Sequence, residues 1–199
     1  MNKSRILSLV FILLLNPLSV SGSDIIFFDN FKYFLPLGND RTHDYKSLRH
    51  RIIGRYGDYR KSAISGHRHS GIDIQGTFGE TVYSIGKGRV THIFRHFPHK
   101  TIYIQHDNGA GASFYSVYIH IEDIRVNVGD WVTENTALAR IFNCEELRAA
   151  QFCTPPHLHF EIRHNISDRG DATFNCMSIS DLDRYCMDPL QFFRRVSKE

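Results

Sequence analysis

Three short patterns in the chain contain residues whose types and spacing could do chemistry. The first is His69-Ser70-Gly71-Ile72-Asp73, which pairs an imidazole with a carboxylate. In a straight strand, residues four apart share a face but lie roughly 13 Å apart, too far to bind one ion. A bend at Gly71 is therefore required. With that bend, His69 and Asp73 could both bind zinc, at about 2 Å from the ion.

The second pattern is the pair His157 and His159 in the sequence PPHLHFEI. In a strand both histidines face one side, while Leu158 and Phe160 face the core. Two histidines at this spacing can both bind a metal, or one can bind it while the other reaches a bound water. The spacing does not choose between these arrangements. Two hydrogen-bonded histidines on a solvated strand face are the alternative without chemistry.

The third pattern is Tyr118-Ile119-His120, where strand alternation predicts the tyrosine and the histidine on one face. Alone it indicates nothing, because the chain has 12 histidines and most are expected at the surface. The three patterns gain meaning only from the elements that would bring them together.

Strands dominate the expected elements. From Ile52 onward, short runs of Val, Ile, Tyr and Phe alternate with Gly, Asn and Asp, which is typical of antiparallel strands and hairpins. Asn108-Gly109 predicts a tight turn, since both residues tolerate positive φ. Segments 145–152 and 180–185 could form short helices, the second capped by Ser180. The expected strands include 81–85, 88–94, 101–106, 113–121 and 131–132.

The start of the chain is typical of a secretory signal peptide. Lys3 and Arg5 precede an apolar stretch over 6–15, and small residues follow. This stretch is shorter than the roughly 20 residues that span a bilayer, so we expect removal of residues 1–22 rather than a permanent anchor. Residues 23–48 would form an arm that packs on one domain, residues 49–196. The exported chain, periplasmic or secreted, would have no stable membrane span.

Charge and cysteine content narrow the function further. Loss of residues 1–22 removes two basic residues and no acid, which lowers the formal charge from +3 to +1. Without a basic stripe, nucleic-acid binding is excluded. Four cysteines in an oxidising compartment favour two disulfides, and the lack of close Cys-x-x-Cys pairs disfavours a cysteine zinc site. The cysteines are Cys144, Cys153, Cys176 and Cys186.

Taken in order, the His-x-x-x-Asp, Tyr-x-His and His-x-His patterns resemble those of the lysostaphin and LytM-type zinc endopeptidases. The resemblance covers about residues 50–193 and is specific as a combination. It implies a mainly β fold, the antiparallel sheet domain of the LytM/lysostaphin (duplicated hybrid motif) type with short peripheral helices. Further segments that resemble the family are 52–56, 79–90, 106–109, 126–141 and 188–190.

The resemblance also implies roles for the site residues. One zinc ion would be bound by His69, Asp73 and His159, with a fourth position open for water. His120 and His157 would be catalytic histidines that do not bind the metal. His157 is the candidate general base and His120 the partner of the oxyanion or leaving group, although the two roles could be exchanged.

By the same resemblance, Tyr118 would bind substrate or orient groups near the cleft, with a packing role as the alternative. The expected activity is hydrolysis of peptide bonds in peptidoglycan stem peptides or cross-links by an exported zinc metalloendopeptidase. A non-catalytic regulator of other cell-wall hydrolases is one alternative, but such a protein should lack ligand residues. A secreted zinc protease that acts on proteins is the other. The oligomeric state stays open.

Some segments depart from the family pattern. Pro155 and Pro156 precede His157 where a glycine-containing loop is expected. The segments that hold the cysteines resemble insertions, each bracketed by one sequential pair, so we expect the pairings 144 with 153 and 176 with 186. These departures affect the cleft walls and therefore the substrate preference.

Overall fold

A computed structural model describes the chain over residues 31–38, 44–61, 66–96, 99–109, 111–145, 154–167 and 172–197. Within these residues the chain forms mostly antiparallel strands with a few short helices, which confirms the expected fold class. The expected signal peptide, 1–22, and almost all of the expected helix over 145–152 lie outside the described residues. In the described residues, no helix is both long and apolar enough to cross a membrane.

The elements are short, and only four strands reach seven residues in the described chain. The strands are β1 (Ile52–Gly54), β2 (Tyr59–Lys61), β3 (Gly66–Arg68), β4 (Ile72–Gln75), β5 (Thr81–Tyr83), β6 (Gly88–Phe94), β7 (Thr101–Asp107), β8 (Ser113–Ile119), β9 (Ile121–Glu122), β10 (Trp131–Val132), β11 (Ala137–Ile141), β12 (His157–Arg163) and β13 (Cys186–Met187). The helices are η1 (Tyr45–Arg51), η3 (Ala172–Asn175), α1 (Ile179–Leu182) and α2 (Pro189–Val196).

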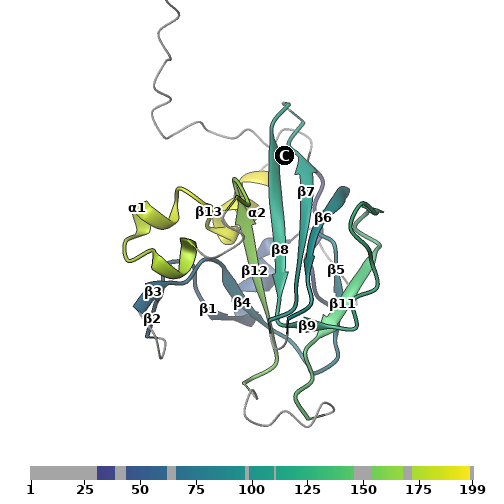
Figure 1. Cartoon of the computed structure of the whole chain (residues 1–199), viewed down its shortest axis with the longest axis horizontal. Helices are drawn as coiled ribbons and strands as arrows, with labels where there is room; N and C mark the ends of the chain where they lie inside the picture. The colour runs from purple at the N-terminus through teal and green to yellow at the C-terminus, as the bar shows by residue number, and fades with distance from the viewer. Residues whose placement is uncertain are drawn as a thin grey trace, which may run out of the picture.

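One large sheet positions all three sequence patterns. Its strands follow the order β1-β4-β12-β8-β7-β6-β10, with β13 also paired to β12. Strands β5, β11 and β9 form a second sheet, and in Figure 1 they lie on the opposite side of the large sheet from β2, β3 and α1. Because β12 lies between β4 and β8, the histidine pair is adjacent to the strands that follow or contain the other two patterns.

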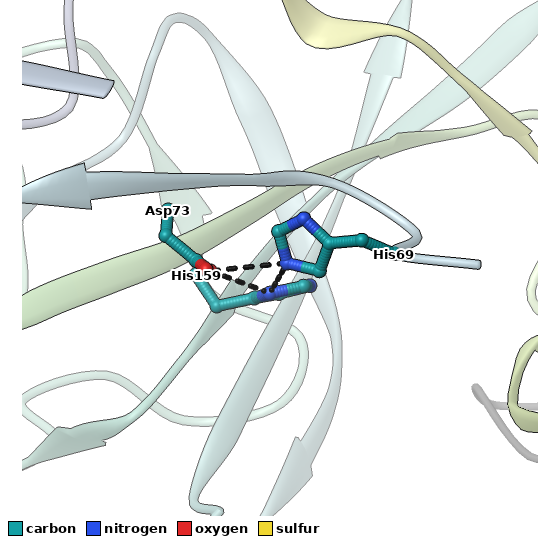
Figure 2. A group of neighbouring side chains, drawn as sticks. All are labelled: His69, Asp73 and His159. Atoms are coloured by element: carbon teal, nitrogen blue, oxygen red, sulfur yellow. Dashed lines mark hydrogen bonds and ion pairs between the residues drawn. The ribbon is translucent and has the colours of Figure 1, made fainter. Parts of the chain in front are cut away.

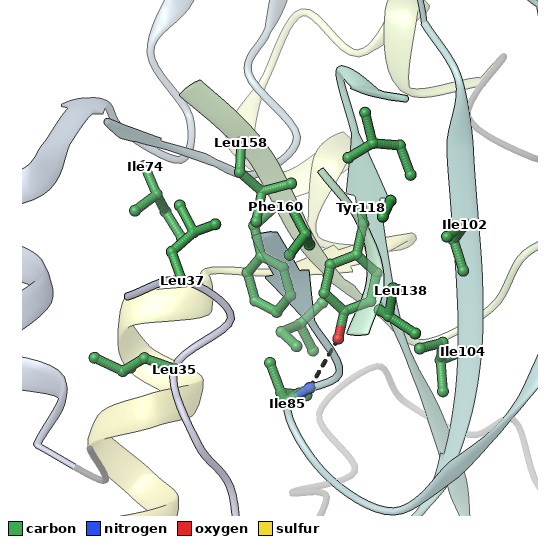
Figure 3. Close-up of a cluster of buried hydrophobic side chains, with 14 of the residues drawn as sticks. Leu35, Leu37, Ile74, Ile85, Ile102, Ile104, Tyr118, Leu138, Leu158 and Phe160 are labelled. Atoms are coloured by element: carbon green, nitrogen blue, oxygen red, sulfur yellow. Dashed lines mark hydrogen bonds between the residues drawn. The ribbon is translucent and has the colours of Figure 1, made fainter. Parts of the chain in front are cut away.

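The core lies on one face of this large sheet. Along β12, Leu158 and Phe160 are fully buried, which confirms the expected alternation. Figure 3 shows them packed with side chains from other strands and from residues 31–38. Leu35 and Leu37, from the segment expected to be an arm, are buried in this cluster. The domain boundaries themselves stay a prediction.

Helix α2 closes the core near the end of the chain. Asp188 caps it by accepting a hydrogen bond from the backbone N–H of Leu190 at 2.9 Å, and Pro189 takes the first turn, where no N–H is needed. Phe192 and Phe193 are fully buried against the sheet. Residues 188–190 resemble the family's closing segment in sequence, and the helix that begins at Pro189 is an additional finding of the structure.

Three local expectations were wrong. The strand expected over 113–121 is divided into β8 and β9 at His120. The turn at Asn108-Gly109 is wider than expected, because Asp107 pairs with Ser113 and leaves five residues between them. Asn108 closes this loop with hydrogen bonds to Ala112. Helix α1 begins at Ile179 and its cap is Ser178, not Ser180.

The structure gives partial information on the cysteines. Cys144 is buried and disulfide-bonded, but Cys153, its expected partner, lies outside the described residues. Cys176 and Cys186 are buried in one small cluster with Leu182, although the structure draws no bond between them. Both expected pairings therefore stay predictions.

Candidate metal centre and catalytic cleft

His69, Asp73 and His159 converge on one point beside strands β4 and β12 of the large sheet (Figure 2). His69 Nε2 lies 3.1 Å from Asp73 Oδ1, and His159 Nδ1 lies 3.1 Å from the same oxygen. The two ring nitrogens are 2.9 Å apart. All three residues are buried, with 5%, 6% and 8% of their surfaces exposed.

Local backbone geometry explains this convergence. His69 precedes a bend at Gly71, and Asp73 lies in the strand that follows. A Cβ at Gly71 would lie 2.2 Å from the carbonyl oxygen of Phe160, so only glycine allows the bend to approach β12 this closely. Asp73 is directly opposite His159 in the β4–β12 register. The bend expected from the sequence is therefore present, and glycine is required there because the backbone lies so close to Phe160.

Hydrogen bonds on the far side of each ring fix which nitrogen faces this point. His69 Nδ1 lies 2.9 Å from the carbonyl oxygen of Arg55, and this acceptor requires a proton on Nδ1. His159 Nε2 lies 2.9 Å from Glu161 Oε1, which requires the proton on Nε2. The other nitrogen of each ring, Nε2 of His69 and Nδ1 of His159, therefore faces the shared point. Asp73 Oδ2 accepts a 2.7 Å hydrogen bond from Arg60.

The donor set fits a zinc ion. Tetrahedral zinc with bonds of about 2.0–2.1 Å has ligand atoms about 3.3 Å apart, close to the three separations found here. Two imidazoles and one carboxylate are common zinc ligands, and three protein ligands with an open fourth position are typical of catalytic sites. The hydrogen bonds to Arg55 and Glu161 are the outer contacts that usually orient such histidines.

The buried charges of this centre stabilise one another. Burial opposes ionisation of Asp73, but hydrogen bonds from His159 and His69 outweigh it and hold the pKa of this carboxyl well below its usual range. Burial also opposes protonation of His159, yet its bonds to Asp73 and Glu161 raise its pKa to about 9. For Glu161, burial is likewise outweighed by the bond to His159, so its pKa is lowered.

A cleft of about 750 Å³ opens over the centre, and both expected catalytic histidines line it. The ring centroids of His120 and His157 are 4.9 Å apart, and the His120 ring is 6.1 Å from that of His159. His157 Nδ1 donates a 2.7 Å hydrogen bond to the carbonyl oxygen of Pro155. The prolines that depart from the family pattern therefore form part of the cleft wall and orient His157.

Tyr118 does not line this cleft, and of its two expected roles the structure favours packing. It is fully buried in the core, where its hydroxyl accepts a hydrogen bond from the backbone N–H of Ile85 at 2.9 Å (Figure 3) and is hydrogen-bonded to the Ser116 hydroxyl at 3.1 Å. It lies opposite Phe160, a core residue, whereas Ile119 lies opposite His159. Strand alternation therefore directs Tyr118 away from the metal centre.

His120 reaches the cleft because it leaves the strand. Its φ of 64° is in the left-handed region, which is uncommon for residues other than glycine. This turn ends the alternation of β8, so Tyr118 and His120 do not share a face. Strained backbone of this kind is often found at functional sites. The two-residue spacing predicted one shared face for Tyr118 and His120. It could not predict the left-handed backbone at His120, which separates them.

Three residues beside the site were not predicted from the sequence. Glu161 and Arg60 contact His159 and Asp73 of the candidate metal centre. His99 lies at the cleft with its Nδ1 3.2 Å from His120 Nδ1. Glu161 was detectable, because it continues the two-residue spacing of His157 and His159. Arg60 and His99 belong to none of the three patterns.

Comparisons with known proteins agree with this geometry. The model of Peptidase family M23 matches residues 67–171, more than half of the chain. No curated protein matches this chain. Among solved structures, LytU is 28% identical with a TM-score of 0.50, and the match covers 71% of this chain and 83% of LytU.

Two further solved structures are similar in fold. The catalytic domain of the antimicrobial peptidase lysostaphin from Staphylococcus simulans is 20% identical with a TM-score of 0.53, over 77% of this chain and 99% of that domain. A chain of the SpoIIQ–SpoIIIAH pore-forming complex is 15% identical with a TM-score of 0.52, over 81% and 90%. At these identities the similarity shows the fold alone.

Proposed function

The chain belongs to peptidase family M23, and from this premise we propose that it is an exported zinc metalloendopeptidase that hydrolyses peptide bonds in peptidoglycan stem peptides or cross-links. The observation that supports the proposal is the convergence of His69, Asp73 and His159 beneath a cleft that also contains His120 and His157. The substrate class rests on the resemblance of these motifs to lysostaphin and LytM-type endopeptidases. Export rests on the sequence pattern of residues 1–22.

The residues of the cleft have different roles in the proposed peptide hydrolysis. One zinc ion at the centre would polarise the scissile carbonyl and lower the pKa of the attacking water toward 7. His157 is suited to accept a proton, because its Nδ1–H is bonded to Pro155 and its Nε2 therefore has a lone pair. A general base of this kind typically contributes about 100- to 10,000-fold in rate.

His120 is suited to remain neutral beside the reacting carbonyl. Burial, reinforced by the nearby His159, His157 and His99, lowers its pKa well below the ordinary value. A neutral imidazole has one N–H, which can donate a hydrogen bond to the oxyanion that develops during attack. His157 and His120 are therefore proposed as proton acceptor and oxyanion partner.

The test is hydrolysis by the purified chain lacking residues 1–22. We expect it to bind about one zinc ion and to release new amino termini from purified peptidoglycan, with activity lost in chelator and restored by zinc. Casein serves as the protein substrate, and the His159→Ala variant serves as the inactive control. Cleavage of casein without cleavage of peptidoglycan would support the secreted protease instead, and absence of both metal and hydrolysis would support the regulator.

A further inference from the structure

We propose that His99 is a positioning residue that holds His120 in the tautomer with its proton on Nε2. His120 is then fixed as the hydrogen-bond donor of the cleft and His157 as the acceptor. The inference rests on the proposed function, in which both histidines act on the substrate. It assigns the two roles that the family resemblance leaves exchangeable.

Sheet register places His99 beside His120. Thr101, at the start of β7, pairs with Ile119 at the end of β8, so the residues just before β7 lie next to those just after β8. Thr101 is buried and its hydroxyl donates a 2.8 Å hydrogen bond to the carbonyl oxygen of His99. The result is a ring pair with centroids 5.0 Å apart and with Nδ1 facing Nδ1 at 3.2 Å.

Two ring nitrogens at this distance need one proton between them, because two lone pairs would repel and two N–H groups would clash. Burial lowers the pKa of both histidines, so each ring has a single N–H near neutral pH. If His99 provides the shared proton, Nδ1 of His120 is the acceptor and its own proton must lie on Nε2.

Exposure favours His99 as the donor. His99 is exposed, so its Nε2 lone pair can accept a hydrogen bond from bulk water after Nδ1–H is committed. His120 is only partly exposed and lines the cleft, so a lone pair on its Nε2 would face the developing oxyanion instead. Negative charge in the cleft therefore selects the Nε2–H tautomer of His120 during the reaction.

A hydrogen-bond partner also fixes the tautomer of His157, but here the partner is an acceptor. Pro155 offers a carbonyl oxygen, which can only accept, so His157 has its proton on Nδ1 and a lone pair on Nε2. His99 offers a donor, so His120 has the reverse arrangement. The two catalytic rings, 4.9 Å apart, thus present one acceptor and one donor to a substrate between them. Exchange of the roles would require both tautomers to change.

The experiment compares the wild type with His99→Asn and His99→Leu by imidazole ¹⁵N NMR, which reports the tautomer of His120 directly. Asparagine can place an amide N–H near the Nδ1 position, whereas leucine removes the donor. We expect Nε2–H at His120 in the wild type and in His99→Asn, and a mixture of tautomers in His99→Leu. Because His99 is exposed, neither substitution should prevent folding.

Kinetics and metal binding provide the second readout. In His99→Leu we expect kcat on a peptidoglycan peptide to fall about tenfold, less than for complete loss of an oxyanion donor, with KM and zinc affinity by chelator competition unchanged. His99→Asn should recover most of kcat. His50→Leu is the matched control, because His50 is also an exposed histidine but does not line this cleft.

Two NMR results would overturn the inference: a proton on Nδ1 of His120 in the wild type, or an unchanged tautomer in His99→Leu. Equal loss of kcat in His50→Leu would also contradict it, since the effect would not be specific to the bonded ring. The protein could show the expected tautomers and yet cleave no peptidoglycan. That result would count against the proposed function but would still support the role of His99.

Discussion

His157 and His159 lie two residues apart on one strand, and composition alone treats them alike. Their partners differ. His159 is buried with Asp73 and Glu161 at the candidate metal centre, whereas His157 is partly exposed and bonded to the backbone at Pro155. Two histidines on one face of a strand can therefore have different roles, because each ring contacts a partner from a different segment.

Replacement of each histidine by alanine should separate these jobs. His159→Ala removes a proposed metal ligand, so zinc affinity and hydrolysis should fall together. His157→Ala leaves His69, Asp73 and His159 in place, so zinc should remain bound while kcat falls by about 100- to 10,000-fold. Elemental analysis and turnover on peptidoglycan check both. Loss of zinc from His157→Ala with retention in His159→Ala would reverse the assignment.

Tyr118 is the residue whose expected role differs most from its place in the structure. Tyr118→Phe removes the hydroxyl that accepts from Ile85 and leaves that buried N–H without its acceptor. We expect the free energy of unfolding to fall by about 1–3 kcal/mol, with kcat and KM of the folded protein unchanged. Tyr59→Phe, at an exposed tyrosine, is the control. A fall in kcat without a change in stability would restore the substrate-binding role.

At the scale of elements, the strands were predictable because alternation and turn residues are local. The expected strand over 88–94 matches β6, and the one over 131–132 matches β10. The convergence of His69, Asp73 and His159 was predictable because their types and order are specific. The bend at Gly71 could also be deduced, since His69 and Asp73 cannot meet without it.

The remaining features depend on contacts between distant segments. The division between β8 and β9 follows from the left-handed backbone of His120, and nothing in the alternation of 113–121 reveals it. Arg60 and His99 enter the site only through strand register. Helix α2, by contrast, was detectable: Asp188 and Pro189 form a cap and first turn, and buried Phe192 and Phe193 follow at helical spacing.

The segment 31–38 supports the core and does not cover the cleft. The backbone N–H of Phe34 donates to Ile85, Leu35 is buried, and none of the described residues 31–38 lines the cleft. Leu35→Ala should therefore lower the free energy of unfolding by about 2–4 kcal/mol and leave kcat of the folded protein unchanged. Chemical denaturation measures the first effect, with Val128→Ala at an exposed position as the control. Higher activity in Leu35→Ala would indicate an inhibitory plug.

At the scale of the whole molecule, buried histidines link stability to pH at two separate places. One is the cleft. The other is His106 on β7, which is 1% exposed and bonded to the carbonyl oxygen of Lys87 at 2.8 Å and to the hydroxyl of Ser116 at 2.7 Å. Its ring stacks on Phe114 at a centroid distance of 5.0 Å. Burial outweighs the bond to Lys87 and lowers the pKa of His106 from 6.5 to about 4.

This lowered pKa predicts a loss of stability in mild acid. The unfolded chain binds a proton at His106 below pH 6.5, whereas the folded chain does so only near pH 4, so stability is complete above 6.5 and is lost as the pH falls between these values. Between pH 7 and 4.5 this residue should remove about 2–3 kcal/mol. His120 shifts stability in the same direction, so the measurement is the difference between the wild type and His106→Gln, from urea unfolding at each pH. The variant is expected to start less stable at pH 7 but to lose less on acidification. Parallel curves, or an NMR titration of His106 near pH 6.5 in the folded protein, would show that its burial has no effect on acid stability.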